Sequence, residues 1–358
     1  MQRKFGLDLI RTLAIALVLI SHGSFFLVSI WPETENLLWA GFWGVELFFV
    51  LSGYLIGGII IREMRRSAFN VVSFWKRRWY RTLPAYYFFL AVNVIFFHFL
   101  NNEFPDFELY SFFLQNLAWK HPDFFPEAWS LAVEEFFYLL FPVVVYILNK
   151  FIRNWEKSFI VAGLSILFFF TAYRIIYVMK SDPLWDEGVR KIVLCRLDSI
   201  MYGIGLALIL DKFGRFINNE KYLFAGLTIL IVSIIIFFGV DRDINVFSKT
   251  FLFSITSLGF ACCFPYFVNL DRSKFIFVNK FIANFAAWSY SIYLSNLLSL
   301  SITKMYLEPR MDSDTLSRII LLAFFVLLTV SISICSYRFI ETPFLRFRDR
   351  RQALKLAN

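Results

Sequence analysis

The sequence has 358 residues, of which 59% are hydrophobic, 20% aromatic and only 18% charged. Soluble domains carry about 45–50% apolar and about 25% charged residues, so this composition excludes a soluble enzyme, a disordered chain and a fibrous repeat. The 36 Lys and Arg residues exceed the 27 Asp and Glu residues, which gives a net charge of +9. In a membrane protein such a surplus marks cytoplasmic loops and not a nucleic-acid partner.

Apolar runs long enough to cross a bilayer recur along the whole chain. They lie at about 5–29, 38–61, 83–100, 128–148, 158–179, 192–211, 222–240, 249–270, 281–303 and 316–337. The first run contains Asp8 and Arg11, and no small-residue cleavage site follows it, so we interpret it as a retained helix and not a signal peptide. The sequence predicts an all-α polytopic membrane protein with about ten transmembrane helices.

Lys and Arg residues are distributed unequally between alternate loops. The loops on the side of the two termini hold 24 of them, and the loops on the other side hold 8. Because positive residues concentrate in cytoplasmic loops, we expect both termini in the cytoplasm. We also expect a single membrane domain over residues 1–345, a short basic cytoplasmic tail at 346–358 and no appended soluble domain.

The first predicted helix carries ionisable residues that need a reason to lie in a membrane. Arg11 and His22 are eleven residues apart, which places them within about 20° of the same helix face and about 16 Å apart along the axis. One face therefore presents a cation near the cytoplasm and an imidazole deeper in the membrane. The alternative for His22 is a hydrogen bond that joins two helices.

The fourth predicted helix contains two adjacent carboxylates, Glu134 and Glu135. Each charge costs about 2.5–3.5 kcal/mol at the centre of a bilayer. Glu134 shares a helix face with Ser130 and is the better candidate to point into the bundle. We expect one of the two carboxylates to orient His22 as a general base. The alternative is a structural ion pair with Arg196.

Two later helices add polar candidates. Arg196 and Asp198 point to different faces of the sixth predicted helix, so we expect them to have different partners. Asn296, in the ninth, is placed to hydrogen-bond either a hydroxyl substrate or a neighbouring helix.

The loop predicted at 62–81 combines seven basic residues with aromatic ones. One interpretation is an interfacial helix that binds anionic lipid. The other uses Arg78 and Arg81, which share a face and together with Arg11 would clamp the phosphates of an anionic cofactor. No phosphate-binding glycine loop is present, which argues against an ATPase or a dehydrogenase. No cysteine has the spacing of a metal ligand, so we predict no metal site.

Several short motifs occur in a fixed order along the chain. They are Arg11-x10-His22, Phe48-Phe49-x-x-Ser52-Gly53, Arg78-x-x-Arg81, Trp129-Ser130-Leu131-x-Val133-Glu134-Glu135-x-Phe137-Tyr138, Arg196-Leu197-Asp198, Tyr290-Ser291-x-Tyr293-Leu294 and Arg338-Phe339-Ile340-Glu341-x-Pro343-Phe344. Each motif alone is weak, but the ordered set strongly resembles the acyltransferase 3 family of membrane-bound O-acyltransferases.

This resemblance implies an acyl-CoA donor, usually acetyl-CoA, that approaches from the cytoplasm of a bacterium, across whose inner membrane the protein lies. It also implies an acceptor hydroxyl on an extracytoplasmic or lipid-linked glycan. The candidate residues fall into three groups. They are catalytic (His22, Arg11, Glu134, Glu135), donor-binding (Arg78, Arg81, Ser52, Arg11) and acceptor-binding (Trp129, Ser130, Arg196, Asp198, Asn296).

This chain departs from many relatives at Ala132 and Phe136, where they have Ser and Gln, and from several at Asn296, where they have His. We therefore carry over no acceptor identity. Direct transfer with His22 as general base is the expected reaction, and an acyl-histidine relay is its variant. The alternative function is a proton-coupled transporter or flippase of a lipid-linked sugar, with His22, Glu134 and Arg196 as a proton relay.

Overall fold

The structure is a computed structural model that describes residues 4–214, 217 and 219–357, and these residues form helices and connecting turns without any strand. Ten helices match the ten predicted apolar runs one for one. They are α1 (Phe5–Gly23), α2 (Ala40–Arg65), α3 (Val71–Asn101), α5 (Ala128–Ile152), α6 (Trp155–Ser181), α7 (Leu197–Phe213), α8 (Asn219–Gly239), α10 (Leu252–Val268), α11 (Ile276–Ile302) and α12 (Thr315–Ser336). The predicted all-α class is confirmed.

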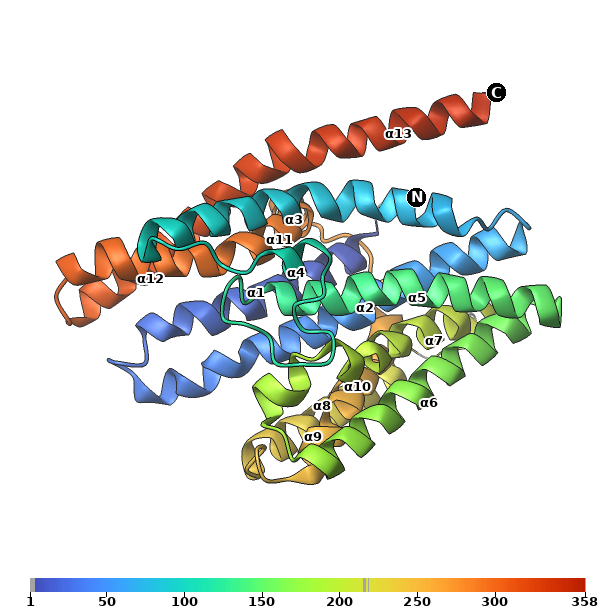
Figure 1. Ribbon diagram of the computed structural model, residues 1–358, viewed down its shortest axis with the longest axis horizontal. Helices are drawn as coiled ribbons and strands as arrows, with labels where there is room; N and C mark the ends of the chain where they lie inside the picture. Colours follow the sequence, from blue (N-terminus) through green and yellow to red (C-terminus); the bar gives the residue numbers. More distant parts are fainter. Residues whose placement is uncertain (1–3, 215–216, 218, 358) are drawn as a thin grey trace.

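The helices run back and forth between two ends of the molecule (Figure 1). We call the end where α1 begins and α2 ends the terminal end, because both chain termini lie toward it, and the other the opposite end. The other α-helices of the described residues are α4 (Glu108–Ser111), α9 (Val246–Thr250) and α13 (Thr342–Ala357). Short 3-10 and π-helical segments, such as Pro32–Trp39 and Asp186–Arg190, lie between helices.

Seven helical segments of the described residues are long and apolar enough to cross a membrane. They are Phe5–Phe26, Pro32–Arg65, Val71–Asn101, Ala128–Ile152, Trp155–Ser181, Asn219–Gly239 and Thr315–Arg351. The helix α10 is a shorter apolar helix. The helices α7 and α11 form where predicted but do not belong to this set, because α7 has only 17 residues and the Ser, Asn and Tyr residues of α11 make its composition less apolar. The chain is a polytopic membrane protein.

The helix α3 begins at Val71, twelve residues before the predicted start at 83. The side chain of Asn70 caps it, since its Oδ1 accepts a hydrogen bond from the backbone N–H of Ser73 at 2.8 Å. The expected loop from 62 to 81 is therefore mostly helix. As a result, Arg78 and Arg81 project from a fixed element.

Glycines bring α2 and α7 into direct backbone contact. A Cβ atom at Gly53 would overlap the carbonyl oxygen of Ile200, and one at Gly203 would overlap the carbonyl oxygen of Val50. Only glycine fits at such a crossing. Ser52, the neighbour of Gly53, bonds Glu134 of α5.

Two fully buried ion pairs connect α2, α6 and α7. Arg196 pairs with Glu46 of α2, and Asp198 pairs with Arg174 of α6 at 2.6 Å. The expectation that Arg196 and Asp198 have different partners is confirmed. The alternative ion pair of Arg196 with Glu134 or Glu135 is not formed, because Glu46 occupies the guanidinium.

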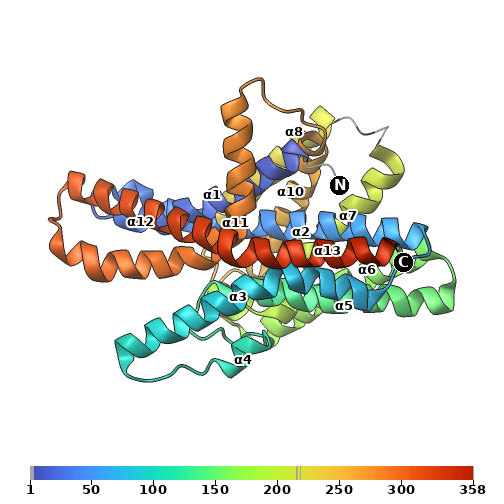
Figure 2. The same ribbon diagram turned by 90° about the horizontal axis from the view of Figure 1, so that it is seen from above.

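The last helix, α13, lies alongside α3 (Figure 2). The rings of Tyr80 and Phe347 are 5.6 Å apart, and Arg351 donates a hydrogen bond to the Tyr80 hydroxyl at 3.2 Å. Most of the predicted tail at 346–358 is thus part of a helix. Its last residue lies outside the described residues, as do Arg3 and Arg215, two of the basic residues counted in the loops.

Candidate functional site

The middle of the bundle contains a cavity of about 90 Å³, which we call the central cavity. Side chains from α1, α2, α3, α5 and α11 line it. Arg11, Arg78 and Arg81 lie in its wall, and Glu134 is the one acidic side chain among its described lining residues. The excess of positive charge suits an anionic ligand. The fold therefore brings together the arginines that the sequence grouped.

Glu134 is held from two sides in this cavity. The Ser52 hydroxyl donates a hydrogen bond to its Oε1 at 2.8 Å, and the Tyr138 hydroxyl donates to its Oε2. The guanidinium of Arg78 lies 4.1 Å from the centre of the Tyr138 ring, and its buried Nε has no hydrogen-bond partner among the described residues. The prediction that Glu134 points into the bundle is confirmed.

Glu135 faces a different neighbour. It is buried and accepts a hydrogen bond from the Thr82 hydroxyl at 2.8 Å, which links α5 to α3. It is not among the described residues that line the central cavity. The two adjacent carboxylates thus have separate positions, and Glu135 joins two helices.

A second cavity of about 260 Å³ lies toward the opposite end and includes His22, so we call it the histidine cavity. Val45 and Tyr293 line both cavities and form the partition between them. The Tyr293 hydroxyl is 2.6 Å from the hydroxyl of Ser130, which fixes the ring. Arg11 and His22, on one helix, therefore reach adjacent cavities.

The partner of His22 is Asn296. Its side-chain oxygen Oδ1 bonds Nδ1 of the ring, while its Nδ2 donates to two carbonyls of its own helix at 3.2 and 2.6 Å. This pattern assigns the proton of the neutral imidazole to Nδ1 and leaves Nε2 as the acceptor nitrogen. The expectation that Glu134 or Glu135 orients His22 is wrong, because both are bonded elsewhere.

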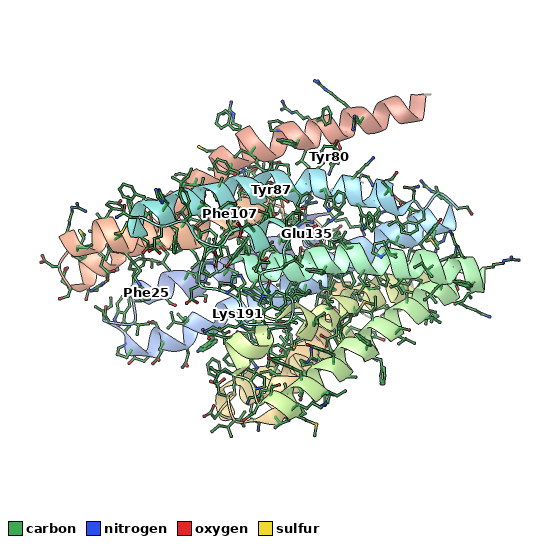
Figure 3. The ribbon with its side chains drawn as sticks, viewed as in Figure 1. Phe25, Tyr80, Tyr87, Phe107, Glu135 and Lys191 are labelled. Carbon is green, nitrogen blue, oxygen red and sulfur yellow. The ribbon has the colours of Figure 1, made fainter. Side chains whose placement is uncertain are left out.

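The wall of the histidine cavity contains Trp129, Arg190 and Lys191. Phe25 also lines this cavity, and both Phe25 and Lys191 are labelled in Figure 3. Arg190 lies 4.8 Å from the centre of the Trp129 ring. Arg190 and Lys191 both pair with Asp186, Lys191 at 2.8 Å. Burial alone would raise the pKa of Asp186, but the two cations outweigh burial and hold this pKa below its ordinary value.

Glu127 also lines the histidine cavity, and the sequence reasoning missed it. It precedes α5 directly and therefore lies outside the apolar run in which charges were sought. Its side chain is 3% exposed, and neither carboxylate oxygen has a hydrogen-bond partner among the described residues. Burial raises the pKa of Glu127 to about 8. The signal available was its place two residues before Trp129.

Two predicted acceptor-binding residues are placed elsewhere. Arg196 and Asp198 are fully buried in their ion pairs and are not among the described residues that line either cavity. Their positions fit a role in joining helices. Of the other three predicted ones, Trp129 lines the histidine cavity and Asn296 bonds the His22 ring. Ser130 lines the central cavity and bonds the partition residue Tyr293.

A third cavity, of about 860 Å³, opens at the terminal end, and we call it the terminal cavity. Lys4, Arg62 and Arg65 line it together with Tyr54. Arg65 is paired with Asp211. Leu55 lines both this cavity and the central one, so the three cavities follow one another through the bundle. Within the described residues, no group of three or more His, Cys, Asp or Glu side chains is arranged to hold a metal ion.

Comparison with known proteins gives one family and several relatives. The model of the acyltransferase 3 family, described as Acyltransferase domain, matches residues 4–338. The chain is 28% identical over 367 residues to the O-acetyltransferase OatA of Staphylococcus aureus strain NCTC 8325, covering 94% of this chain and 56% of the relative. It is 29% identical over 391 residues to the putative O-acetyltransferase SACOL0978 of strain COL, covering 99% of this chain and 58% of the relative. The chain thus spans little more than half the length of these relatives. No solved structure matches it.

Proposed function

The chain belongs to the acyltransferase 3 family, and from this premise we propose that it is a membrane O-acyltransferase. The donor is acyl-CoA, with acetyl as the acyl group, and the acceptor is a hydroxyl of an extracytoplasmic or lipid-linked glycan. Residues 1–345 form the catalytic membrane domain, which lies in the bacterial inner membrane with its terminal end in the cytoplasm.

The observation that carries this proposal is the series of three cavities. Each shares lining residues with the next, Leu55 at one junction and Val45 with Tyr293 at the other. The series leads from the basic terminal end to His22. A reaction that joins a donor from one side with an acceptor from the other needs this arrangement.

The cations of the first two cavities suit the phosphates of the donor. Lys4, Arg62 and Arg65 line the wide terminal cavity, which has room for a nucleotide. The arginines of the narrow central cavity lie farther in, beside Ser52 and Glu134. Arginine binds phosphate with paired, charge-assisted hydrogen bonds, and the narrow cavity suits an extended thioester arm.

The chemical step takes place at the partition. Nε2 of His22 accepts the proton of the acceptor hydroxyl, and the oxygen attacks the thioester carbonyl carbon. A C–O bond forms, the C–S bond breaks, and the proton passes from His22 to the departing CoA sulfur. Asn296 keeps the Nδ1 proton in place, so that Nε2 stays the basic nitrogen.

Labelled acetyl-CoA tests this proposal in membranes that contain the protein and its native glycans. The wild type should transfer label to the saccharide fraction. The His22→Ala variant should lose transfer by about 100-fold or more, because a positioned general base contributes about 10²–10⁴-fold. His98→Ala is the matched control, since this histidine stacks on Phe104 and lines neither of the two inner cavities.

Two results would contradict the proposal. One is wild-type transfer by a correctly folded His22→Ala variant. The other is movement of unmodified lipid-linked saccharide across the membrane without any acyl transfer, which would indicate the transporter or flippase.

A further inference from the structure

The carboxyl group of Glu127 is an unexplained feature of the histidine cavity. It lines the same cavity as His22, its side chain is 3% exposed, and both of its oxygens lack a hydrogen-bond partner among the described residues. Native proteins seldom bury a polar group without a partner. The missing partner must therefore come from whatever fills the cavity.

The cations in the wall do not supply this partner. Arg190 and Lys191 are both bonded to Asp186, and Arg190 also stacks on Trp129. Their positions are thus fixed by other groups. Among the described residues that line the cavity, Glu127 is the acidic one, and no cation pairs with it.

The backbone holds Glu127 in its place. Its carbonyl oxygen accepts hydrogen bonds from the Tyr293 hydroxyl at 3.3 Å and from the Ser130 hydroxyl at 3.5 Å. Tyr293 is part of the partition between the two inner cavities. Glu127 is therefore anchored beside the point where the donor's reactive end and the acceptor would meet.

The charge state of Glu127 limits the ligand. Burial raises its pKa to about 8, so the neutral carboxyl is the main form at neutral pH. A neutral carboxyl offers one O–H donor and one carbonyl acceptor. A hydroxyl group has the same pair of functions, whereas an ammonium group would need the ionised form.

The cavity also offers an apolar surface close to this carboxyl. Trp129 lies two residues after Glu127 and lines the same cavity, together with Phe25 and Trp39. Aromatic rings combined with a few fixed polar groups are typical of sites for polar organic ligands. A saccharide ring, with apolar faces and hydroxyls at its edge, has this character.

On the basis of the function proposed above, we propose that Glu127 is a positioning residue of the acceptor subsite. Its carboxyl group hydrogen-bonds a hydroxyl of a saccharide next to the hydroxyl that His22 deprotonates. The pair of contacts selects acceptors with two neighbouring hydroxyls and orients the reacting one.

The test compares two reactions of labelled acetyl-CoA in purified membranes: transfer to the native saccharide fraction and hydrolysis to free acetate, in which water replaces the acceptor. The Glu127→Leu variant should lose about 10- to 100-fold in transfer, since a polar group of the acceptor is left unpaired. Its ratio of transfer to hydrolysis should therefore fall about 10-fold or more, because water does not use the contact with the saccharide. Glu127→Gln keeps one donor and one acceptor and should retain transfer within about threefold.

The controls separate this inference from the proposed function. Glu187→Gln removes a carboxylate that pairs with Lys120 outside the cavity, and it should behave as wild type. If the wild type shows no transfer, the proposed function fails. If the wild type transfers and Glu127→Leu transfers equally well, the role of Glu127 is overturned.

A second variant keeps the test decisive if Glu127→Leu does not fold. Glu127→Asp retains the carboxyl but withdraws it by one methylene, so transfer should fall about fivefold or more relative to hydrolysis. Equal loss of transfer and hydrolysis in Glu127→Asp would indicate a structural role and would overturn the proposal.

Discussion

At the scale of single residues, the hydrogen bond between His22 and Asn296 decides which ring nitrogen is basic. The sequence predicted the depth and the helix face of His22, because these follow from spacing alone. It did not predict the partner, which lies 274 residues away. Helical periodicity gives the direction of a side chain but not the neighbouring helix in that direction. Helical periodicity is therefore equally compatible with Glu134 and with Asn296 as the partner of His22.

Replacement of Asn296 by Ala tests this assignment. The ring then loses the bond that fixes its tautomer, so we expect the rate of acetyl transfer to fall about 10- to 100-fold. The KM for acetyl-CoA should not change, since Asn296 does not line the described part of the central cavity. Asn279→Ala, on the same helix but bonded to the backbone of Ser273, is the control. A change in KM without a change in rate would contradict the assignment.

Glu127 also makes a prediction about stability and pH. Its folded pKa of about 8 lies above the ordinary value of 4.5, so the folded state binds more protons than the unfolded state between these values. The free energy of unfolding should therefore decrease as pH rises from about 5 to 8. Glu127→Gln stays neutral at every pH and escapes this loss.

Thermal unfolding in detergent measures the effect. The melting temperature of Glu127→Gln relative to wild type should be higher at pH 8 than at pH 5. Burial also lowers the pKa of His121 to about 4, but this group is present in both proteins and cancels in the comparison. A difference that does not depend on pH would contradict the shifted pKa of Glu127.

At the scale of helices, hydropathy predicted where each element lies but not where it ends. It placed the start of α3 at 83 because the first turns of this helix are basic and aromatic, although Asn70 caps the helix before them. It also counted α11 as a span, whereas the buried Ser and Asn side chains of this helix line cavities and bond neighbouring helices. Hydropathy measures affinity for lipid, so it misses the basic first turns of α3 and cannot tell that the polar side chains of α11 face protein.

The crossing of α2 and α7 provides a prediction with an internal control. Gly53→Ala places a methyl group against the Ile200 carbonyl, so the helices must separate and the free energy of unfolding should fall by roughly 1–3 kcal/mol or more. Gly58→Ala, on the same helix, meets nothing within 4 Å and should unfold as wild type does. Thermal unfolding of the two variants checks this. Equal melting temperatures would show that the close contact is absent.

At the scale of the whole molecule, most of the charge is explained by topology. The 24 to 8 division of Lys and Arg between alternate loops predicts the orientation, although two of the 24, Arg78 and Arg81, belong to α3 and line the central cavity. A few further charges lie within the predicted spans. Arg11 and Glu134 line the central cavity, whereas Arg196 and Asp198 hold helices together. Sequence cannot separate these two roles, because both need buried charges and only the packing decides which ones meet a cavity.

In the proposed reaction, donor and acceptor meet at the partition between the central and the histidine cavities. The most direct measurement is a cryo-electron microscopy map of the protein with a thioether analogue of acetyl-CoA. We expect the nucleotide in the terminal cavity near Arg62, the arm beside Arg78 and the acyl end directed toward His22. A nucleotide bound at the opposite end, or an acyl end directed away from His22, would contradict it.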